Sequence, residues 1–224
     1  MEVSTYYADA AALADPALYR KLYGSLPDFR KTKADMFVFA KDRRLSVGAW
    51  ALLAAALADL GEEPSDVGFE AGGKPFLIGS DIRFNISHSE ERVMCSVSDS
   101  DVGCDVEMVR DAGLEIAKRY FYGTEYDSIA AEADPEKASV LFCRLWTLKE
   151  SFMKAVGLGM SLPLHSFEIS LGGEASVRQD VDDRTYRFKE YDPGDGYRCA
   201  VCSTEGRFEQ KMRRVDFASH RFTI

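Results

Sequence analysis

The chain of 224 residues fits one large domain or two small ones, and either arrangement leaves room for a substantial core. Hydrophobic residues make up 46% of it and charged residues 29%, which is ordinary globular usage and excludes a disordered chain or a fibre. The 37 acidic residues outnumber the 28 basic ones, and the net charge of −9 argues against non-specific binding of nucleic acid. An anion would have to be bound by a local basic patch or through a metal ion.

The first residues and the cysteines predict a cytoplasmic protein. Residues 1–21 contain neither a basic leader followed by a long apolar stretch nor a membrane anchor, so we expect no signal peptide and no membrane partner. Five cysteines, an odd number, argue against a disulfide framework. Cys199 and Cys202 lie three apart in a strand-like pattern, which places them on opposite faces and predicts structural thiols rather than a zinc site.

Apolar spacing predicts the first elements along the chain. Residues 42–60 carry apolar side chains at helical spacing, and Gly61 ends this helix. Three strands are predicted next, over 82–87, 92–98 and 102–108, with a polar turn between the last two. A short helix follows over 114–121. Thr124 is predicted to cap the next helix, with Asp127 in the capping-box position.

The second half combines one long helix with further strands. Asp134 and Pro135 begin a helix whose apolar residues recur every three or four positions until Gly157. Beyond Pro163, strand-like segments are broken by glycine and proline turns, and the whole order predicts an α+β fold without a linker. Two pairs of short segments, beginning at 68 and 166 and at 94 and 198, are alike. They suggest an internal duplication, although such short words also recur by chance.

Two carboxylates are predicted to share one face of the strand over 102–108. Asp105 and Glu107 are two residues apart, so their side chains point the same way. Neighbouring carboxylates repel each other unless they share a proton or bind a hard cation. A solvated polar face has the same pattern, and the spacing alone leaves both interpretations open.

A second cluster lies on the long helix. Glu150 and Lys154 are one helical turn apart, on the face that also carries Trp146. An exposed ion pair would show the same spacing. With only three histidines and no HxxxH or HxH spacing, the sequence argues against a zinc enzyme.

Two further features can bind phosphate. Ser87 and His88 end a predicted strand, where they offer a hydroxyl and an imidazole, or form a turn. Between residues 28 and 44, six basic and three acidic side chains leave a net charge of +3 in a protein of −9. Such a run is usually a solvated face, but beside a metal site it favours anion binding.

The order of these motifs is more informative than any one of them. The segments GKPFL, FNISHS, VGCDVE, FYGTEY and RLWTLKESFMKAVGLGMSLPL follow one another between residues 72 and 167. This series resembles the 4′-phosphopantetheinyl transferases of the Sfp type. The VGxDxE and WxxKESFxKAxGxG elements, in that order, are highly specific to them.

The resemblance implies a fold and a reaction. The fold would be a pseudo-dimer of two similar α+β halves, residues 1–100 and 101–224, with the active site in the cleft between them. Coenzyme A and one Mg²⁺ would lie in that cleft. The enzyme, expected as a monomer, would transfer the phosphopantetheine arm of coenzyme A to a serine of an apo acyl or peptidyl carrier protein, releasing adenosine 3′,5′-bisphosphate.

The resemblance also assigns individual residues. The metal ligands would be Asp105, Glu107 and Glu150. Glu150 is the first candidate for the base that deprotonates the serine and Glu125 the second, while Lys154 would stabilise charge on the pyrophosphate. Of the coenzyme A contacts, Ser87 and His88 would hold the 3′-phosphate and Lys74 would lie against the adenine. The full set of expected contacts is Lys31, Arg44, Lys74, Pro75, Ser87, His88, Asp105 and Lys154.

Two other functions share these features. A non-catalytic coenzyme A-binding module would keep the phosphate contacts and lose a metal carboxylate, whereas this chain has all three. A Mg²⁺-dependent phosphoryl or phosphodiester hydrolase would use the same carboxylates with a base that positions water. For a transferase, we expect the carrier to dock on the apolar segment 157–164 together with residues 120–122, unless that segment packs on the core.

Overall fold

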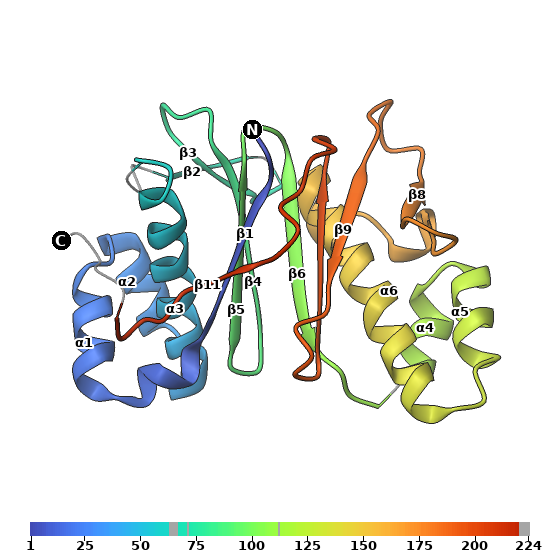
Figure 1. Cartoon of the computed structure of the whole chain (residues 1–224), viewed down its shortest axis with the longest axis horizontal. Helices are drawn as coiled ribbons and strands as arrows, with labels where there is room; N and C mark the ends of the chain where they lie inside the picture. Colours follow the sequence, from blue (N-terminus) through green and yellow to red (C-terminus); the bar gives the residue numbers. More distant parts are fainter. Residues whose placement is uncertain (63–66, 71, 112, 220–224) are drawn as a thin grey trace.

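Two β-sheets stand at the centre of the molecule with helices on their outer sides (Figure 1). The computed structural model describes residues 1–62, 67–70, 72–111 and 113–219. The first sheet has the strand order β11-β1-β5-β4 and the second the order β6-β10-β9. Among the strand pairs of these two sheets in the described residues, β11 with β1 is parallel and the others are antiparallel. This arrangement is the mixed α+β fold that the sequence predicts.

The first sheet is covered by three helices. Its strands are β1 (Ser4–Asp9), β4 (Arg83–Ser89), β5 (Arg92–Ser98) and β11 (Arg213–Arg214). After the short η1 (Ala10–Ala14) come α1 (Pro16–Gly24), α2 (Asp28–Asp35) and α3 (Ala40–Ala58). The predicted helix over 42–60 is α3, begun and ended two residues earlier. All of its leucines and most of its alanines are buried in the core of the first sheet, which explains why this helix is so apolar.

The second sheet packs against the longest helix. Its strands are β6 (Val102–Met108), β9 (Arg187–Tyr191) and β10 (Tyr197–Ser203), and α6 (Pro135–Val156) lies across them. The Asp134 side chain caps α6 by accepting a hydrogen bond from the backbone N–H of Glu136 at 2.9 Å. Gly157, at φ +85°, ends it in the left-handed conformation. These are the boundaries expected from the sequence.

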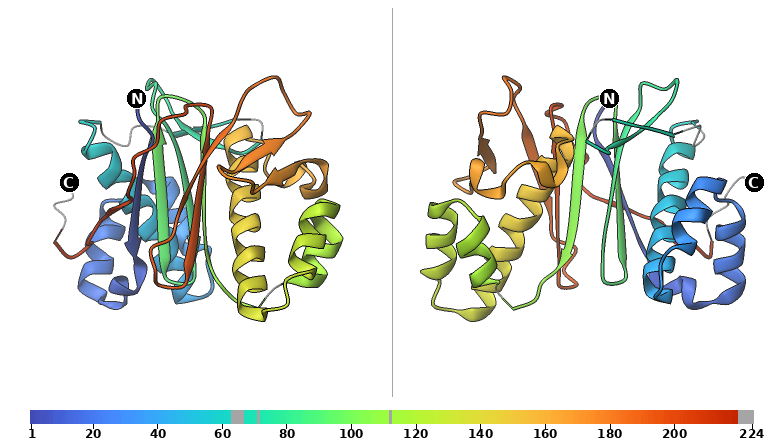
Figure 2. Two further views of the ribbon diagram at one scale, coloured as in Figure 1. Left: turned by 45° about the vertical axis from the view of Figure 1, so that its right-hand side comes forward. Right: turned by 180° about the vertical axis from the view of Figure 1, so that it is seen from behind.

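Shorter elements complete the chain. The helices α4 (Leu114–Tyr120) and α5 (Gly123–Ala130) pack beside α6, and η2 (Gly159–Ser161) and η3 (Leu164–Ser166) follow it (Figure 2). Two small hairpins form from β2 (Val67–Phe69) with β3 (Pro75–Leu77), and from β7 (Glu168–Ser170) with β8 (Ser176–Arg178). No helix in the described ranges is long and apolar enough to cross a membrane.

One predicted helix cap is wrong. Thr124 lies inside α5, whose N-cap is Tyr122. The Glu125 carboxylate accepts a hydrogen bond from the Tyr122 backbone N–H at 3.0 Å, so the acidic residue that closes the first turn is Glu125 rather than Asp127. All five cysteines are buried free thiols, as predicted for structural thiols.

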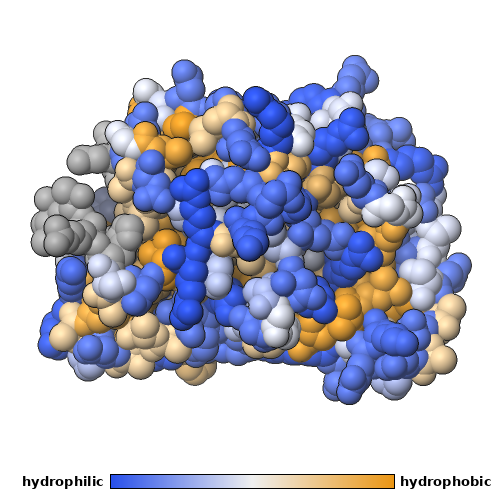
Figure 3. Space-filling model, viewed as in Figure 1, coloured by the Kyte–Doolittle hydropathy of each residue, from blue (hydrophilic) through white to orange (hydrophobic). Residues whose placement is uncertain are grey.

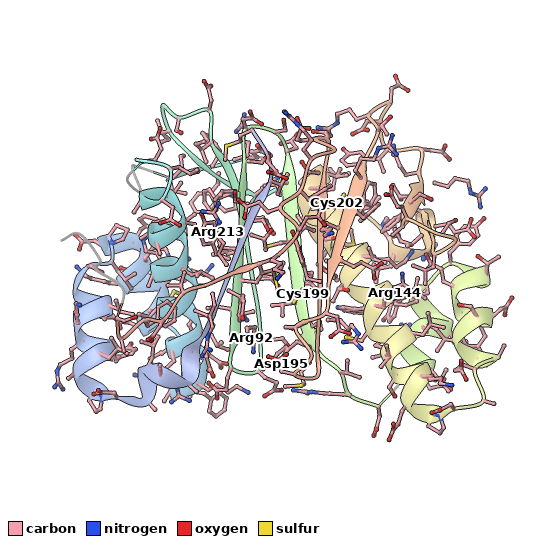
Figure 4. All side chains as sticks on the ribbon, viewed as in Figure 1. Arg92, Arg144, Asp195, Cys199, Cys202 and Arg213 are labelled. Atoms are coloured by element: carbon pink, nitrogen blue, oxygen red, sulfur yellow. The ribbon has the colours of Figure 1, made fainter. Side chains whose placement is uncertain are left out.

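The two sheets are joined across the middle of the molecule. Arg92, on β5, lies between the rings of Tyr7 and Tyr197, with its guanidinium carbon 4.8 and 4.5 Å from their centroids. It also pairs with Asp195 in the turn before β10 (Figure 4). Mostly hydrophilic side chains cover the face that lies over this junction, with apolar residues showing between them (Figure 3).

Candidate active site

A cavity of about 460 Å³ lies between the two sheet-and-helix units. Residues of α2, α3 and β4 line one side of it, and residues of β6 and α6 line the other. Carboxylates and cations therefore meet in one cavity although they are distant in the sequence. The lining residues are Arg30, Lys33, Phe37, Ser46, Ala49, Ile86, Ser87, His88, Asp105, Glu107, Trp146, Glu150 and Lys154.

Asp105 is the most enclosed carboxylate of the cavity. Only 3% of the residue is exposed. Its Oδ1 accepts hydrogen bonds from the Lys154 ammonium at 2.6 Å and from the Ser87 hydroxyl at 2.7 Å. Its Oδ2 is buried and has no hydrogen-bond partner among the described residues. A buried carboxylate oxygen without a donor is costly, so the geometry calls for a further positive group at this position.

Two more carboxylates crowd the same side of the cavity. Burial raises the pKa of Glu107 to about 7, although its Oε2 accepts a hydrogen bond from Ser89 at 2.6 Å. Burial also raises the pKa of Glu150, against the opposing effect of the Lys154 ammonium. For Lys154 itself, burial lowers the pKa, but Asp105 outweighs this effect and the net shift is upward. Lys154 thus remains charged and faces three acidic side chains.

The donor set of the three carboxylates fits a hard divalent cation. No group of three acidic, histidine or cysteine side chains in the described part of the chain forms a ready-made metal cage. Mg²⁺ does not require one, because it commonly takes one or two carboxylates and fills its other positions with water and phosphate oxygens. The unpartnered Oδ2 of Asp105, with Glu107 and Glu150 beside it, provides oxygen ligands of this kind.

Cations and hydroxyls line the opposite side. Arg30 is buried, and its Nη2 donates to the carbonyl and hydroxyl oxygens of Ser46 at 3.0 and 3.3 Å. Its guanidinium carbon lies 5.1 Å from the Trp50 ring centroid, and its Nε has no partner in the described residues. Lys33 is on the same face, three residues along α2. His88 is accessible at this side, where desolvation and the Lys154 charge lower its pKa.

Comparisons with known proteins identify the family of this chain. A family model described as the 4′-phosphopantetheinyl transferase superfamily matches residues 101–202. A 4′-phosphopantetheinyl transferase of Bacillus subtilis is 33% identical over 185 residues, which are 80% of this chain and 82% of that protein. The transferase Sfp of Bacillus subtilis strain 168 is 36% identical over 160 residues, 69% of this chain and 71% of Sfp. This chain belongs to the 4′-phosphopantetheinyl transferase family.

Among solved structures, a holo-[acyl-carrier-protein] synthase of Thermotoga maritima is similar at 20% identity and a TM-score of 0.40. The match covers 48% of this chain and 64% of that one.

Several residues expected from the transferase motifs do lie at the cavity. Ser87, His88, Asp105, Glu107, Glu150 and Lys154 all line it. The same-face pairings of Asp105 with Glu107, and of Trp146 with Glu150 and Lys154, follow directly from the strand and helix periods.

Other expected residues lie away from this cavity. Lys31 points to Asp28 on its own helix at 3.5 Å, and Arg44 lies 3.6 Å from Glu91. Lys74 is buried, and its ammonium donates to the Ala155 carbonyl at 2.8 Å, near the end of α6. Pro75 begins β3 next to it.

Glu125 is not brought to the cavity by the transferase fold. It is buried in the other core, where its Oε1 accepts hydrogen bonds from the Lys149 ammonium and the Ile169 backbone N–H, both at 2.7 Å. Its second oxygen caps α5. All of these contacts make Glu125 a buried structural partner of Lys149, whereas Glu150 lines the cavity.

Arg30 is a cavity cation to which the sequence assigned no role, and Lys33 was one of several basic candidates for the 3′-phosphate. Both belong to the basic run between residues 28 and 44, where Lys31 and Arg44 were preferred. Their spacing of three, on a helix that begins at Asp28, puts them on one face. That spacing is a signal the sequence contains, but it identifies the face only once the helix boundaries are known.

Proposed function

We propose that this member of the family transfers the 4′-phosphopantetheine arm of coenzyme A to a serine of an apo carrier protein and releases adenosine 3′,5′-bisphosphate. The observation that carries the proposal is the buried Asp105 carboxylate. One of its oxygens binds Lys154 and Ser87, and the other is left unpartnered beside Glu107 and Glu150. Cations of α2 line the same cavity, where they can bind a further phosphate of the substrate.

The proposal includes a pseudo-dimer with its active site between the halves, divided near residue 100. Each half contains one long helix packed on a sheet, α3 on the first and α6 on the second. The two segments with similar sequences, 94–98 and 198–202, lie in β5 and β10, which are internal strands of their respective sheets. This correspondence supports a duplicated α+β unit. A monomer in the cytoplasm stays a prediction from the sequence.

Asp105, Glu107 and Glu150 would hold Mg²⁺. When bound, the ion supplies charge neutralisation for the three carboxylates and for the pyrophosphate oxygens. The fit rests on the oxygen donor set and on the unpartnered Oδ2 of Asp105.

The protein side chains perform the remaining tasks. Lys154, held by Asp105, is positioned to stabilise charge that develops on the leaving phosphate oxygen. Arg30, Lys33 and His88 would bind the 3′-phosphate of coenzyme A, in place of the Lys31 and Arg44 expected earlier. Glu150, which lines the cavity, would be the base for the proton of the carrier serine.

The direct test is to weigh the carrier. The enzyme is incubated with coenzyme A, Mg²⁺ and a panel of apo acyl and peptidyl carriers, and intact-protein mass spectrometry follows each carrier. The proposal expects one phosphopantetheine arm on the carrier serine and a stoichiometric amount of adenosine 3′,5′-bisphosphate. Binding of coenzyme A without a gain in carrier mass would indicate a binding module. Breakdown of coenzyme A without that gain would indicate a hydrolase.

A further inference from the structure

An exposed apolar loop lies at the rim of the cavity, between α2 and α3. We call its four residues, Met36, Phe37, Val38 and Phe39, the 36–39 loop. Met36 is 79% exposed, Val38 80% and Phe39 70%, whereas Phe37 turns inward and lines the cavity. Single exposed apolar residues are common on protein surfaces, but three large ones in four consecutive positions indicate a contact surface.

Two basic side chains, Arg43 and Lys33, lie beside the loop. Residues 28–44 have a net charge of +3, although the protein as a whole has −9. The Arg43 guanidinium donates to the Val38 carbonyl at 3.1 Å and so lies against the loop, and Lys33 lies at the cavity rim beside it. An acidic partner would be repelled by most of this protein and attracted to this region.

We propose that the 36–39 loop docks the acceptor carrier protein, through an acidic carrier surface with an apolar residue close to the acceptor serine. The inference rests on the proposed function. A carrier whose serine enters the cavity must cover the rim, and Phe37 fixes the loop at that rim. The apolar tip would supply the buried contact, and the two basic side chains would supply orientation and a faster encounter.

The segment 157–164, expected from the sequence to dock the carrier, differs from the 36–39 loop in its burial and in its distance from the cavity lining. Leu162 and Leu164 are buried in the core beside α6. Met160 is 84% exposed, but neither it nor Leu158 lines the cavity. Met36 and Met160 are therefore a matched pair, because they are the same residue with nearly equal exposure at two different surfaces.

The experiment compares Met36→Glu and Val38→Glu with Met160→Glu. Steady-state kinetics measure the KM for carrier and for coenzyme A separately, and thermal melting confirms that each variant folds. A charge placed in the apolar centre of an interface removes one of the few contacts that carry most of the binding energy, so we expect the carrier KM to rise about tenfold in the two loop variants, which corresponds to about 1.4 kcal/mol. We expect the coenzyme A KM of these variants, and both constants of Met160→Glu, to stay within about twofold of wild type.

The possible outcomes separate the two proposals. If the wild-type enzyme modifies no carrier, the proposed function fails. If it modifies the carrier and the loop variants keep the wild-type carrier KM, the docking proposal fails while the function stands. A raised carrier KM in Met160→Glu alone would move the docking surface to segment 157–164. If sedimentation velocity shows a dimer that Met36→Glu dissociates without changing the carrier KM, the loop is a contact between two copies.

Discussion

At the scale of single residues, the Asp105 carboxylate is the group that binds both Lys154 and Ser87 in the cavity. Replacing it with alanine removes the partner of Lys154 and one of the three proposed metal ligands. We expect Asp105→Ala to abolish phosphopantetheine transfer and to leave the far-ultraviolet circular dichroism spectrum unchanged, because both cores are built by other residues. Carrier mass is the readout of activity. Full activity of this variant at sub-millimolar Mg²⁺ would contradict the metal assignment.

His88 tests the assignment of the 3′-phosphate. Its pKa is lowered in the free protein, so the imidazole is largely neutral at pH 7 and gains a proton when a phosphate dianion binds beside it. A hydrogen bond to a charged group contributes about 1.5–3 kcal/mol, so His88→Ala should raise the KM for coenzyme A roughly tenfold or more. The KM for 3′-dephospho-coenzyme A should change much less. Equal increases for the two substrates would remove His88 from the 3′-phosphate.

The Glu125–Lys149 pair makes a prediction about stability rather than catalysis. Lys149 is fully buried, and burial lowers its pKa, so it depends on Glu125 for its charge partner. Glu125→Ala should reduce the free energy of unfolding by about 3–5 kcal/mol, measured by urea denaturation. The double variant Glu125→Leu with Lys149→Met should recover most of this loss and retain transfer activity. A double variant that folds without activity would restore Glu125 as a catalytic candidate.

At the scale of elements, one glycine sets the distance between β6 and α6. A Cβ atom on Gly103 would lie 2.2 Å from the Ser151 carbonyl oxygen and 2.3 Å from the Ala155 backbone nitrogen. The glycine therefore lets α6 approach the strand closely enough for Lys154 to reach Asp105. This contact gives the glycine of the VGxDxE element a physical reason.

Gly103→Ala should therefore separate α6 from β6. We expect a loss of about 1–3 kcal/mol in the free energy of unfolding, as for other overpacked sites, together with a fall in kcat because Lys154 is displaced. Gly24→Ala is the matched control, since a Cβ there meets no atom within 4 Å. Wild-type kcat in a stable Gly103→Ala protein would show that the close approach is unnecessary for activity.

At the scale of the whole molecule, the end of the chain returns to the first sheet. After β10 the chain crosses the molecule and pairs β11 with β1, as the red trace in Figure 1 shows. Phe217 is 1% exposed and belongs to the core of the first sheet, although it follows the second sheet in sequence. The two sheets on either side of the cavity are thus connected by the chain segment between β10 and β11 as well as by the contacts of Arg92.

Phe217→Ala should reveal this dependence. Removing a buried phenylalanine costs about 3–5 kcal/mol, and the loss should appear in the core of the first sheet. Hydrogen exchange should then show faster exchange in β1 and α3, with a lower midpoint of urea unfolding. Phe69→Ala is the control, because Phe69 is 62% exposed. If faster exchange is confined to the residues after β10, the C-terminal segment contributes little to the stability of the first sheet and its helices.

Local pattern predicted α3, α6 and the strands β4, β5, β6 and β10, but it predicted no element over residues 1–39. Apolar residues recur every three or four positions in α3 and α6 and every two positions in β5 and β6. Each of these patterns is contained within its own segment of the sequence. The same-face groups Asp105 with Glu107, and Glu150 with Lys154, follow for the same reason. The sequence also carried the ordered motifs by which the family was recognised.

Only the tertiary structure decided which groups meet. The docking of α2 against α3 brings Arg30 and Lys33 to the cavity and turns Lys31 toward Asp28, a choice that depends on the rotation of one short helix. Packing of α5 on α6 pairs Glu125 with Lys149 and takes it out of the site. These outcomes depend on contacts between segments that are far apart in the chain. The close packing of the two cores determines how such segments are placed relative to each other, and no single segment contains that information.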